Sequence, residues 1–222
     1  HRDRLARGAA HQERRSGDGG RGEDDPGHAA DLVVQGPPLR DRLRPLRGLL
    51  HARGEHLSFA PLGDEEHTIA RWMTAKFGRV STERLLCGAG LSQIDAALAA
   101  GDDLASAFDA RTPLRDPAAL VEAALDGHDL LARRTLARFC AVLGSVAGDA
   151  ALIHGARTVM IAGGIVPRFI PFLRSSAFRE RFLAKGRFAA YLESVTIRVI
   201  THPNPGLLGA AMALRAIQRN RH

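Results

Sequence analysis

The sequence contains few cysteines and almost no lysine. Only Cys87 and Cys140 occur in 222 residues, and they lie far apart without metal-binding spacing. Two isolated thiols argue against a disulfide framework and fit a reducing compartment, so we expect a cytoplasmic protein. Arginine outnumbers lysine by 29 to 2. That bias indicates a GC-rich genome rather than a physical requirement.

Long hydrophobic stretches are also missing. No run of about 18 apolar residues occurs, so the sequence predicts no membrane span. The N-terminal region lacks the apolar core of a signal peptide, and its acidic residues are too frequent for a transit peptide. We therefore expect no membrane as a partner.

Aromatic residues make up 5% of the chain, whereas the formal net charge is +7. Residues 1–54 hold 11 Arg against 8 acidic residues, and the remaining excess is spread over the rest of the chain. A nucleic-acid surface would concentrate its basic residues on one patch or stripe, here interleaved with aromatics. Nucleic acid is therefore not an expected partner.

Residues 1–54 form an Arg- and Gly-rich segment that differs from the rest of the sequence. It shows no hydrophobic periodicity before Leu32, so it cannot bury enough apolar surface to offset the entropy of ordering. Three interpretations stay open: a disordered basic tail, the product of a shifted reading frame or wrongly assigned start, and an arm that binds nucleic acid or an anionic surface. We place the boundary between this segment and the folded domain at residues 54 and 55.

Residues 55–222 alternate between helical and strand patterns, which is typical of an α/β domain. Within the stretch from 81 to 155 the patterns are mostly helical, so we expect a helical insertion there. Gly144 and Gly148 lie four residues apart in a long helix, where each costs roughly 1 kcal/mol relative to Ala. We expect a close helix–helix or helix–sheet contact at these glycines. The predicted helices cover 64–77, 92–99, 129–153, 167–174, 176–184 and 205–218, and a further helix begins at Asp116 and Pro117. The predicted strands cover 158–162 and 195–200.

The segment from Ile161 to Phe169 is the most informative part of the sequence. An apolar strand pattern is followed by Gly163 and Gly164 and then by Pro167, which suits the first turn of a helix. Two missing Cβ atoms allow a flat ligand to approach the backbone closely. A plain strand-to-helix turn explains the same pattern, so the segment alone leaves both interpretations open.

Six segments of the sequence form a further pattern: 56–61, 81–91, 161–169, 186–188, 195–200 and 202–211. In this order and at these spacings they closely resemble the bacterial glucokinase family. The resemblance runs from about Glu55 to about Arg215. It implies the C-terminal large lobe of an actin/hexokinase-like ATPase fold. It also implies transfer of the ATP γ-phosphoryl group to the 6-hydroxyl of glucose, with ATP and Mg²⁺, in glycolysis.

The resemblance also implies site residues. His56 matches the end of a Glu-Gly-Gly-His motif that binds sugar hydroxyls, although Arg53 and Glu55 depart from that motif. Glu83 matches a glutamate that binds the hexose, and Gly163 with Gly164 matches the adenosine-side turn. The residues alone favour a packed or surface histidine at position 56, and at Glu83 a solvated helix glutamate or a partner of Arg84.

The family's aspartate base and its two glycine-rich phosphate loops have no counterpart at matching places here. We therefore assign no catalytic residue and no metal ligand, and expect this chain to be a truncated form with little or no kinase activity. Two alternatives stay open: a non-catalytic regulatory or oligomerisation module, and a kinase of another sugar. The sequence is compatible with a homodimer but does not determine the oligomeric state.

Overall fold

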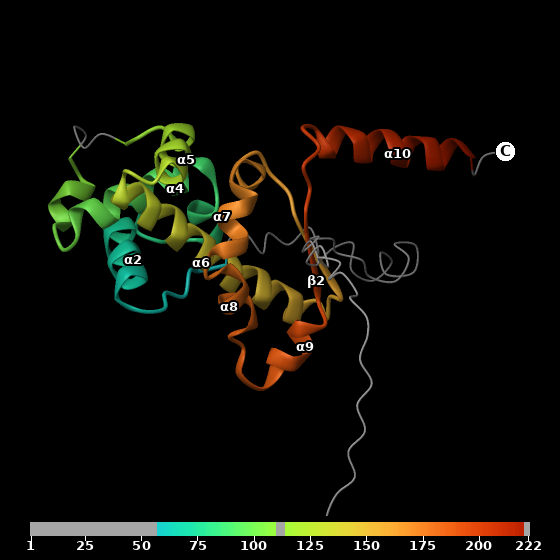
Figure 1. Ribbon diagram of the computed structural model, residues 1–222, viewed down its shortest axis with the longest axis horizontal. Helices are drawn as coiled ribbons and strands as arrows, with labels where there is room; N and C mark the ends of the chain where they lie inside the picture. Colours follow the sequence, from blue (N-terminus) through green and yellow to red (C-terminus); the bar gives the residue numbers. More distant parts are fainter. Residues whose placement is uncertain (1–56, 110–113, 220–222) are drawn as a thin grey trace, which may run out of the picture.

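The computed structural model describes residues 57–109 and 114–219. The expected boundary at residues 54 and 55, the Arg-rich segment 1–54 and His56 lie outside these ranges. The described chain is mostly helical with one parallel sheet at the side of the helical body (Figure 1). This agrees with the expected α/β lobe and its helical insertion.

The elements follow one another in a single order along the chain. The helical part comes first, the two strands enclose a group of short helices, and the longest exposed helix ends the described residues. The α-helices are α2 (Asp64–Phe77), α3 (Thr82–Leu85), α4 (Gly88–Ala100), α5 (Pro117–Asp126), α6 (Leu130–Ile153), α7 (Ile170–Ser175), α8 (Phe178–Leu183), α9 (Ala189–Glu193) and α10 (Pro205–Arg219). The 3₁₀ helices are η2 (Leu104–Ala107), η3 (Val166–Phe169) and η4 (Gly186–Phe188), and the strands are β1 (Thr158–Ile161) and β2 (Thr196–Val199).

Side-chain caps explain where two of these helices begin. The Asp116 carboxylate accepts hydrogen bonds from the N–H groups of the first turn of α5, and Pro117 occupies the first position of that helix. Asp129 accepts from the Ala132 N–H at 2.8 Å and so begins α6. Both predicted helix starts are confirmed.

The predicted start of α4 is wrong. The sequence analysis placed this helix at 92–99. Instead α4 begins at Gly88, and the Cys87 thiol accepts a hydrogen bond from the Gly90 N–H at 3.3 Å. Ser92 lies inside the helix, where its hydroxyl donates to the Arg115 carbonyl at 2.7 Å. Cysteine is an unusual capping residue, so the pattern did not reveal this start.

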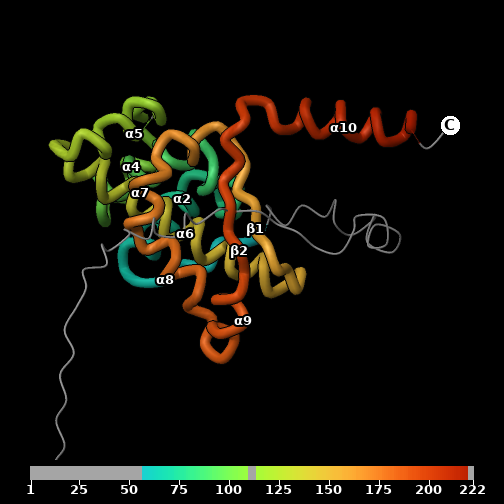
Figure 2. The backbone as a smooth tube through the Cα atoms, turned by 45° about the vertical axis from the view of Figure 1, so that its right-hand side comes forward, coloured from blue at the N-terminus to red at the C-terminus, as the bar shows by residue number. Residues whose placement is uncertain are grey.

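The two strands lie side by side (Figure 2). They are parallel, with Val159 paired opposite Ile197. Val159 and Ile197 are buried against the helical body, whereas Met160 and Arg198 point to the exposed face. Because the strands run in the same direction, their carboxyl ends meet at one edge of the sheet. Ligands of open α/β sheets bind beyond that edge.

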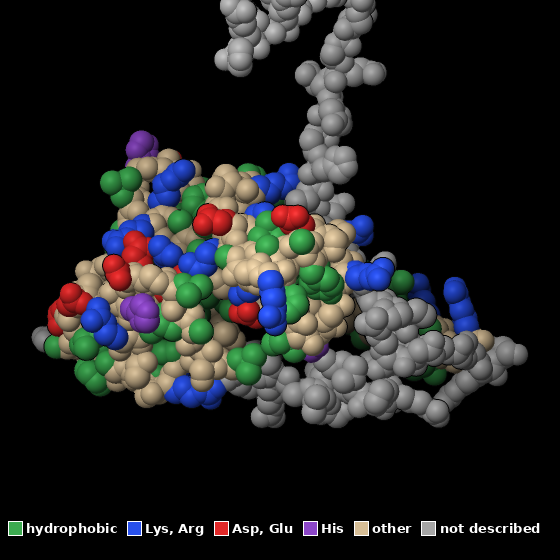
Figure 3. All heavy atoms as spheres, turned by 90° about the horizontal axis from the view of Figure 1, so that it is seen from below, with side chains coloured by type: hydrophobic (Ala, Val, Ile, Leu, Met, Phe, Trp, Pro, Cys, Tyr) green, Lys and Arg blue, Asp and Glu red, His purple; other side chains and the backbone are tan. Residues whose placement is uncertain are grey.

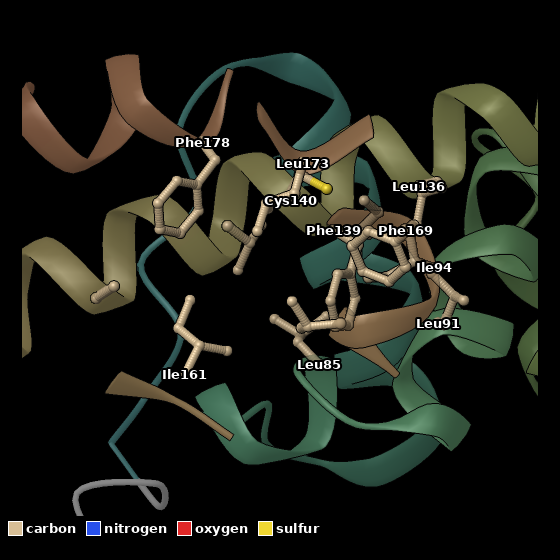
Figure 4. Packing of buried hydrophobic residues seen from close by; sticks show 14 of the residues in the cluster. Leu85, Leu91, Ile94, Leu136, Phe139, Cys140, Ile161, Phe169, Leu173 and Phe178 are labelled. Atoms are coloured by element: carbon tan, nitrogen blue, oxygen red, sulfur yellow. The ribbon is translucent and has the colours of Figure 1, made fainter. Parts of the chain in front are cut away.

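The hydrophobic core lies between α2, α4, α6, α7 and α8 (Figure 4). Phe139 of α6 and Phe169 of η3 meet edge to face with ring centroids 6.2 Å apart. By length and composition α6 could span a membrane, but its buried side chains pack against α5 and α8, as expected of a core helix.

Glycines allow α6 and α8 to approach closely. A Cβ atom at Gly144 would lie 2.2 Å from the Phe178 carbonyl oxygen, and one at Gly148 would lie 2.5 Å from that of Phe182. No real side chain fits at such distances, so the backbone of α8 occupies the space that a side chain would need. The predicted close contact at these glycines is confirmed.

Buried charges connect α2 to α6 and α8. Glu66 is 0% exposed, and its carboxylate accepts from Arg138 at 3.2 Å and from Arg181 at 2.9 Å. Its second oxygen accepts from the Leu62 N–H at 2.8 Å. We call the set Glu65, Glu66, Arg134, Arg138 and Arg181 the charge cluster. Burying an unpaired carboxylate is costly, so the hydrogen bonds from Arg138, Arg181 and the Leu62 N–H offset the cost of burying Glu66.

The last helix, α10, differs from the other described α-helices because none of its residues is buried. It extends away from the helical body (Figure 1). Only Arg215, Gln218 and Arg219 are polar side chains in its 15 residues. A helix that is apolar on nearly every side is normally covered by protein.

Candidate functional site

A pocket of about 530 Å³ opens where α3 meets α4. Its volume lies within the range of small-molecule sites. It brings together an acidic group, two basic groups, an amide, a hydroxyl and a thiol. The residues that line it are Phe77, Arg79, Ser81, Glu83, Arg84, Cys87, Ala89 and Gln93.

The sequence around α3 positions Glu83 in this pocket. Ser81 caps α3 by accepting from the Arg84 N–H at 3.3 Å, which fixes the first turn. Glu83 lies in that turn, is exposed and lines the pocket. Arg84 lies over the ring of Phe77 at 4.1 Å from the centroid, a cation–π contact at the pocket wall.

A glycine brings α4 against α3. A Cβ atom at Gly90 would lie 2.2 Å from the Leu85 carbonyl oxygen and 2.4 Å from that of Arg84. Glycine is therefore required at this position for the two helices to meet. The Cys87 thiol fills the junction, since it also lies 3.7 Å from the Arg84 carbonyl oxygen as a weak donor.

Hydrogen bonds from a neighbouring loop hold α4 in place. Asp95, which is buried, accepts from Arg115 at 2.9 Å and from the Thr135 hydroxyl of α6 at 3.1 Å. Arg115 also pairs with Asp129, the cap of α6. These bonds fix the wall of the pocket that α4 provides.

The chain next to His56 pairs with the segment that carries Glu83. The Thr82 N–H donates to the Leu57 carbonyl at 3.0 Å, and Ser58 forms an antiparallel bridge with Ser81. The predicted sugar residue His56 itself lies outside the described residues. Leu57, which follows His56 in sequence, is therefore hydrogen-bonded to Thr82, which precedes Glu83.

The second predicted site is the turn after β1. Gly163 has a φ of 137°, a conformation that favours glycine, and Gly164 follows it on the exposed surface. A Cβ atom at either glycine would have nothing within 4 Å. The backbone of the turn is therefore open to a flat ligand, at the carboxyl edge of the sheet.

The start of α4, beside the pocket, lies close to the turn after β1. A Cβ atom at Gly88, the first residue of α4, would lie 3.5 Å from the Ile165 methyl group. Gly88 follows Cys87, which lines the pocket, and Ile165 follows Gly164. The structure therefore brings the region of Glu83 next to the region of Gly163 and Gly164.

The sequence analysis missed Gln93, which lines the pocket from the second turn of α4. Only 7% of this residue is exposed, and its side-chain oxygen Oε1 has no hydrogen-bond partner in the described structure. A polar residue between the buried Leu91 and Ile94 was the feature that could have drawn attention to it.

Residues 57–109 and 114–219 contain no group of three His, Cys, Asp or Glu side chains that could hold a metal ion. On the face shown in Figure 3, acidic and basic side chains are interspersed.

Comparison with known proteins identifies what the chain is similar to. A family model described as Glucokinase matches residues 44–217, so the match begins before the boundary expected at residue 55. Glucokinase of Hahella chejuensis is 43% identical over 167 residues, which is 75% of this chain and 50% of that protein. Glucokinase of Cupriavidus metallidurans is 46% identical over 169 residues, covering 74% of this chain and 48% of that protein.

Two further matches agree. Glucokinase of Marinobacter nauticus is 41% identical over 200 residues, which is 89% of this chain and 59% of that protein. The crystal structure of a glucokinase from an Antarctic psychrotroph superposes with a TM-score of 0.64 and 33% sequence identity, covering 74% of this chain and 50% of that one. The chain spans about half the length of most of the curated relatives it matches.

Proposed function

The chain belongs to the glucokinase family, and from this premise we propose that it supplies the sugar pocket and the nucleotide-binding turn of a hexose kinase. That kinase transfers the γ-phosphoryl group of ATP to the 6-hydroxyl of glucose. The proximity of Gly88, at the start of α4, to Ile165, beside the turn, carries the proposal. Phosphoryl transfer requires the sugar and the nucleotide to meet, and the two candidate sites are neighbours at this point.

In the sugar pocket, Glu83 accepts hydrogen bonds from two neighbouring hydroxyls of glucose. An ionised carboxylate has two acceptor oxygens, and its hydrogen bonds are stronger than those of a neutral acceptor. The position of Glu83 in the wall of the pocket supports this role. We also propose His56 as a sugar ligand, on the motif it shares with the family and on the hydrogen bond between Leu57 and Thr82.

In the nucleotide site, ATP lies against the turn formed by Gly163 and Gly164. The open space beside both glycines fits this ligand, since a flat base could approach the backbone there without meeting a side chain. ATP, when bound, supplies the phosphoryl group. The turn holds its adenosine side and leaves the phosphates toward the sugar pocket.

The described residues contain no group of three or more His, Cys, Asp or Glu side chains that could hold Mg²⁺. Mg²⁺ is often held in kinases by one or two carboxylates together with the substrate phosphates. We assign no step of the reaction to it here. We likewise assign no catalytic base among the described residues.

Because the chain spans about half the length of these relatives, we propose that alone it binds glucose and transfers phosphate slowly or not at all. The transfer needs a base and groups that stabilise the phosphates. In the cell we place the protein in the cytoplasm and the reaction in glycolysis, and a homodimer is compatible with this proposal.

Titration calorimetry with D-glucose tests the proposal on the full chain. We expect the wild type to bind glucose and Glu83→Gln to bind about 10- to 100-fold more weakly, since it loses a charge-assisted hydrogen bond. Glu122→Gln is the matched control, because Glu122 is exposed on α5 outside the pocket. A wild-type chain that binds no glucose, or a Glu83→Gln variant that binds as well, would overturn the proposal. Galactose, mannose and fructose in the same titration test for a kinase of another sugar.

The exposed α10 favours a second candidate function, a non-catalytic module that binds another polypeptide. In that case the chain would lack sugar affinity but associate through α10. A chain that sediments as a complex, binds no hexose and becomes monomeric when Leu207 and Met212 are changed to Gln would support this alternative. Both side chains are exposed on α10.

A further inference from the structure

The buried amide of Gln93 is not explained by the packing of α4. The residue is 7% exposed and lines the pocket, and its Oε1 has no partner in the part of the chain that the structure describes. Its neighbours Leu91 and Ile94 are fully buried apolar residues. Leaving a buried carbonyl oxygen unsatisfied costs about 1–3 kcal/mol. An apolar side chain of similar size would avoid that cost.

The other polar groups of the pocket wall already have partners. Ser81 accepts the Arg84 N–H, and the Cys87 thiol accepts the Gly90 N–H. The Arg84 guanidinium lies over Phe77. Gln93 differs from these residues because its buried side-chain oxygen Oε1 has no hydrogen-bond partner in the described part of the chain.

We propose that Gln93 is a further sugar-binding and specificity-determining residue, whose amide hydrogen-bonds a hydroxyl next to those that Glu83 binds. This inference rests on the proposed function, because it assigns a second group in the same pocket. An amide has both an acceptor and two donors, whereas a carboxylate is acceptor-only. A sugar hydroxyl also donates and accepts, so the pair Glu83 and Gln93 matches an uncharged polyol ring.

The proposed contact also predicts discrimination. A site that hydrogen-bonds a hydroxyl rejects an analogue without it, because the buried polar group of the protein is then left unpaired. With Gln93 in place, the deoxyglucose that lacks the hydroxyl bound by Gln93 should bind distinctly more weakly than glucose. Without the amide, glucose and that deoxyglucose should bind alike.

The experiment titrates the full chain with D-glucose and with 1-, 2-, 3- and 4-deoxyglucose. We expect Gln93→Leu to bind glucose about 5- to 10-fold more weakly and to lose its preference over one deoxyglucose, while Glu83→Gln keeps that preference. Gln218→Leu is the matched control, since it makes the same change on the exposed surface of α10. The Tm of Gln93→Leu should equal or exceed that of the wild type, because a purely apolar side chain fits the buried position.

The outcomes separate the two proposals. If the wild type binds glucose and Glu83→Gln weakens it, but Gln93→Leu binds like the wild type with the same deoxyglucose pattern, only the role of Gln93 is overturned. If the wild type binds no hexose, both proposals fail. A readout that needs no variant is the side-chain NH₂ signal of Gln93 in ¹⁵N NMR spectra. This signal should shift when glucose is added, and it should not shift with the deoxyglucose that lacks the hydroxyl bound by Gln93. A signal that glucose leaves unchanged would contradict the hydrogen bond between Gln93 and the sugar.

Discussion

The contact between α6 and α8 gives the sharpest test of the packing. In Gly144→Ala the new methyl group would lie 2.2 Å from the Phe178 carbonyl oxygen and 2.9 Å from its carbon, whereas ordinary contacts begin at 3.4 Å. Both are backbone atoms, so no side-chain rotation relieves the overlap. The helix α8 has to move away from α6.

Two opposing effects determine the size of the change. Alanine in place of glycine stabilises a helix interior by about 1 kcal/mol. Overpacking of a core costs about 1–3 kcal/mol, and here the upper end applies because the retreat of α8 loosens the buried rings of Phe178 and Phe182. We therefore expect Gly144→Ala to lower the free energy of unfolding by about 2 kcal/mol.

Urea unfolding followed by tryptophan fluorescence measures this loss. Trp72 is the chain's single tryptophan and is fully buried, so its emission reports the core. With a slope of about 1–3 kcal/mol per molar urea, the midpoint should fall by about 1 M. The matched control is Gly209→Ala on α10, where a Cβ atom has nothing within 4 Å, and its midpoint should not fall. A Gly144→Ala midpoint at or above that of the wild type, with an unchanged slope, would refute the reasoning.

Three further predictions concern buried or paired groups. Glu66→Gln keeps the shape of the side chain but removes the charge that faces two arginines of the charge cluster, so we expect a loss of about 3 kcal/mol in the same urea assay; a loss under about 1 kcal/mol would contradict the pairing. Partial burial alone would raise the pKa of Glu65, but hydrogen bonds and charges from the arginines of the cluster lower it below its usual 4.5. A depressed folded-state pKa means that this stabilisation is present above about pH 4.5 and is lost as the pH falls through the folded value. The Tm of the wild type should thus drop more steeply below pH 4.5 than that of Glu65→Gln, and parallel curves would count against the effect. Burial raises the pKa of the Cys140 thiol to about 12, against an opposing hydrogen bond with Ser176. At pH 8 a thiol reagent should therefore label one cysteine, Cys87, in the folded chain and two in urea, and rapid labelling of both in the folded chain would be the contrary result.

Much of the local structure could be predicted from the sequence because its causes are local. Asp116 and Asp129 begin their helices through bonds to the next few residues. The spacing of Gly144 and Gly148 indicated a close helix contact, although it did not identify α8 as the partner. The start of α4 was missed because it depends on a cysteine cap and on Gly90 fitting against α3.

The candidate site depends more strongly on contacts that are distant in sequence. Resemblance indicated Glu83 and the glycine turn, but nothing in their spacing predicted that Gly88 would lie against Ile165. Gln93 was missed for a similar reason. Whether a polar residue on a buried helix face has a partner is decided by the surrounding fold, and only the structure shows that its Oε1 has none among the described residues.

The helix α10 has a consequence for the survival of the protein in a cell. Its Leu207 is 73% exposed, and the other large apolar side chains of the helix are exposed as well. Exposed apolar surface of this kind promotes aggregation, and cells continuously triage unfolded and partly unfolded chains by chaperones and proteases. The steady-state abundance of this protein should therefore follow the availability of whatever covers α10. A longer half-life of this chain on co-expression of a binding partner would indicate that the partner covers α10, and this test requires no measurement of enzymatic rate.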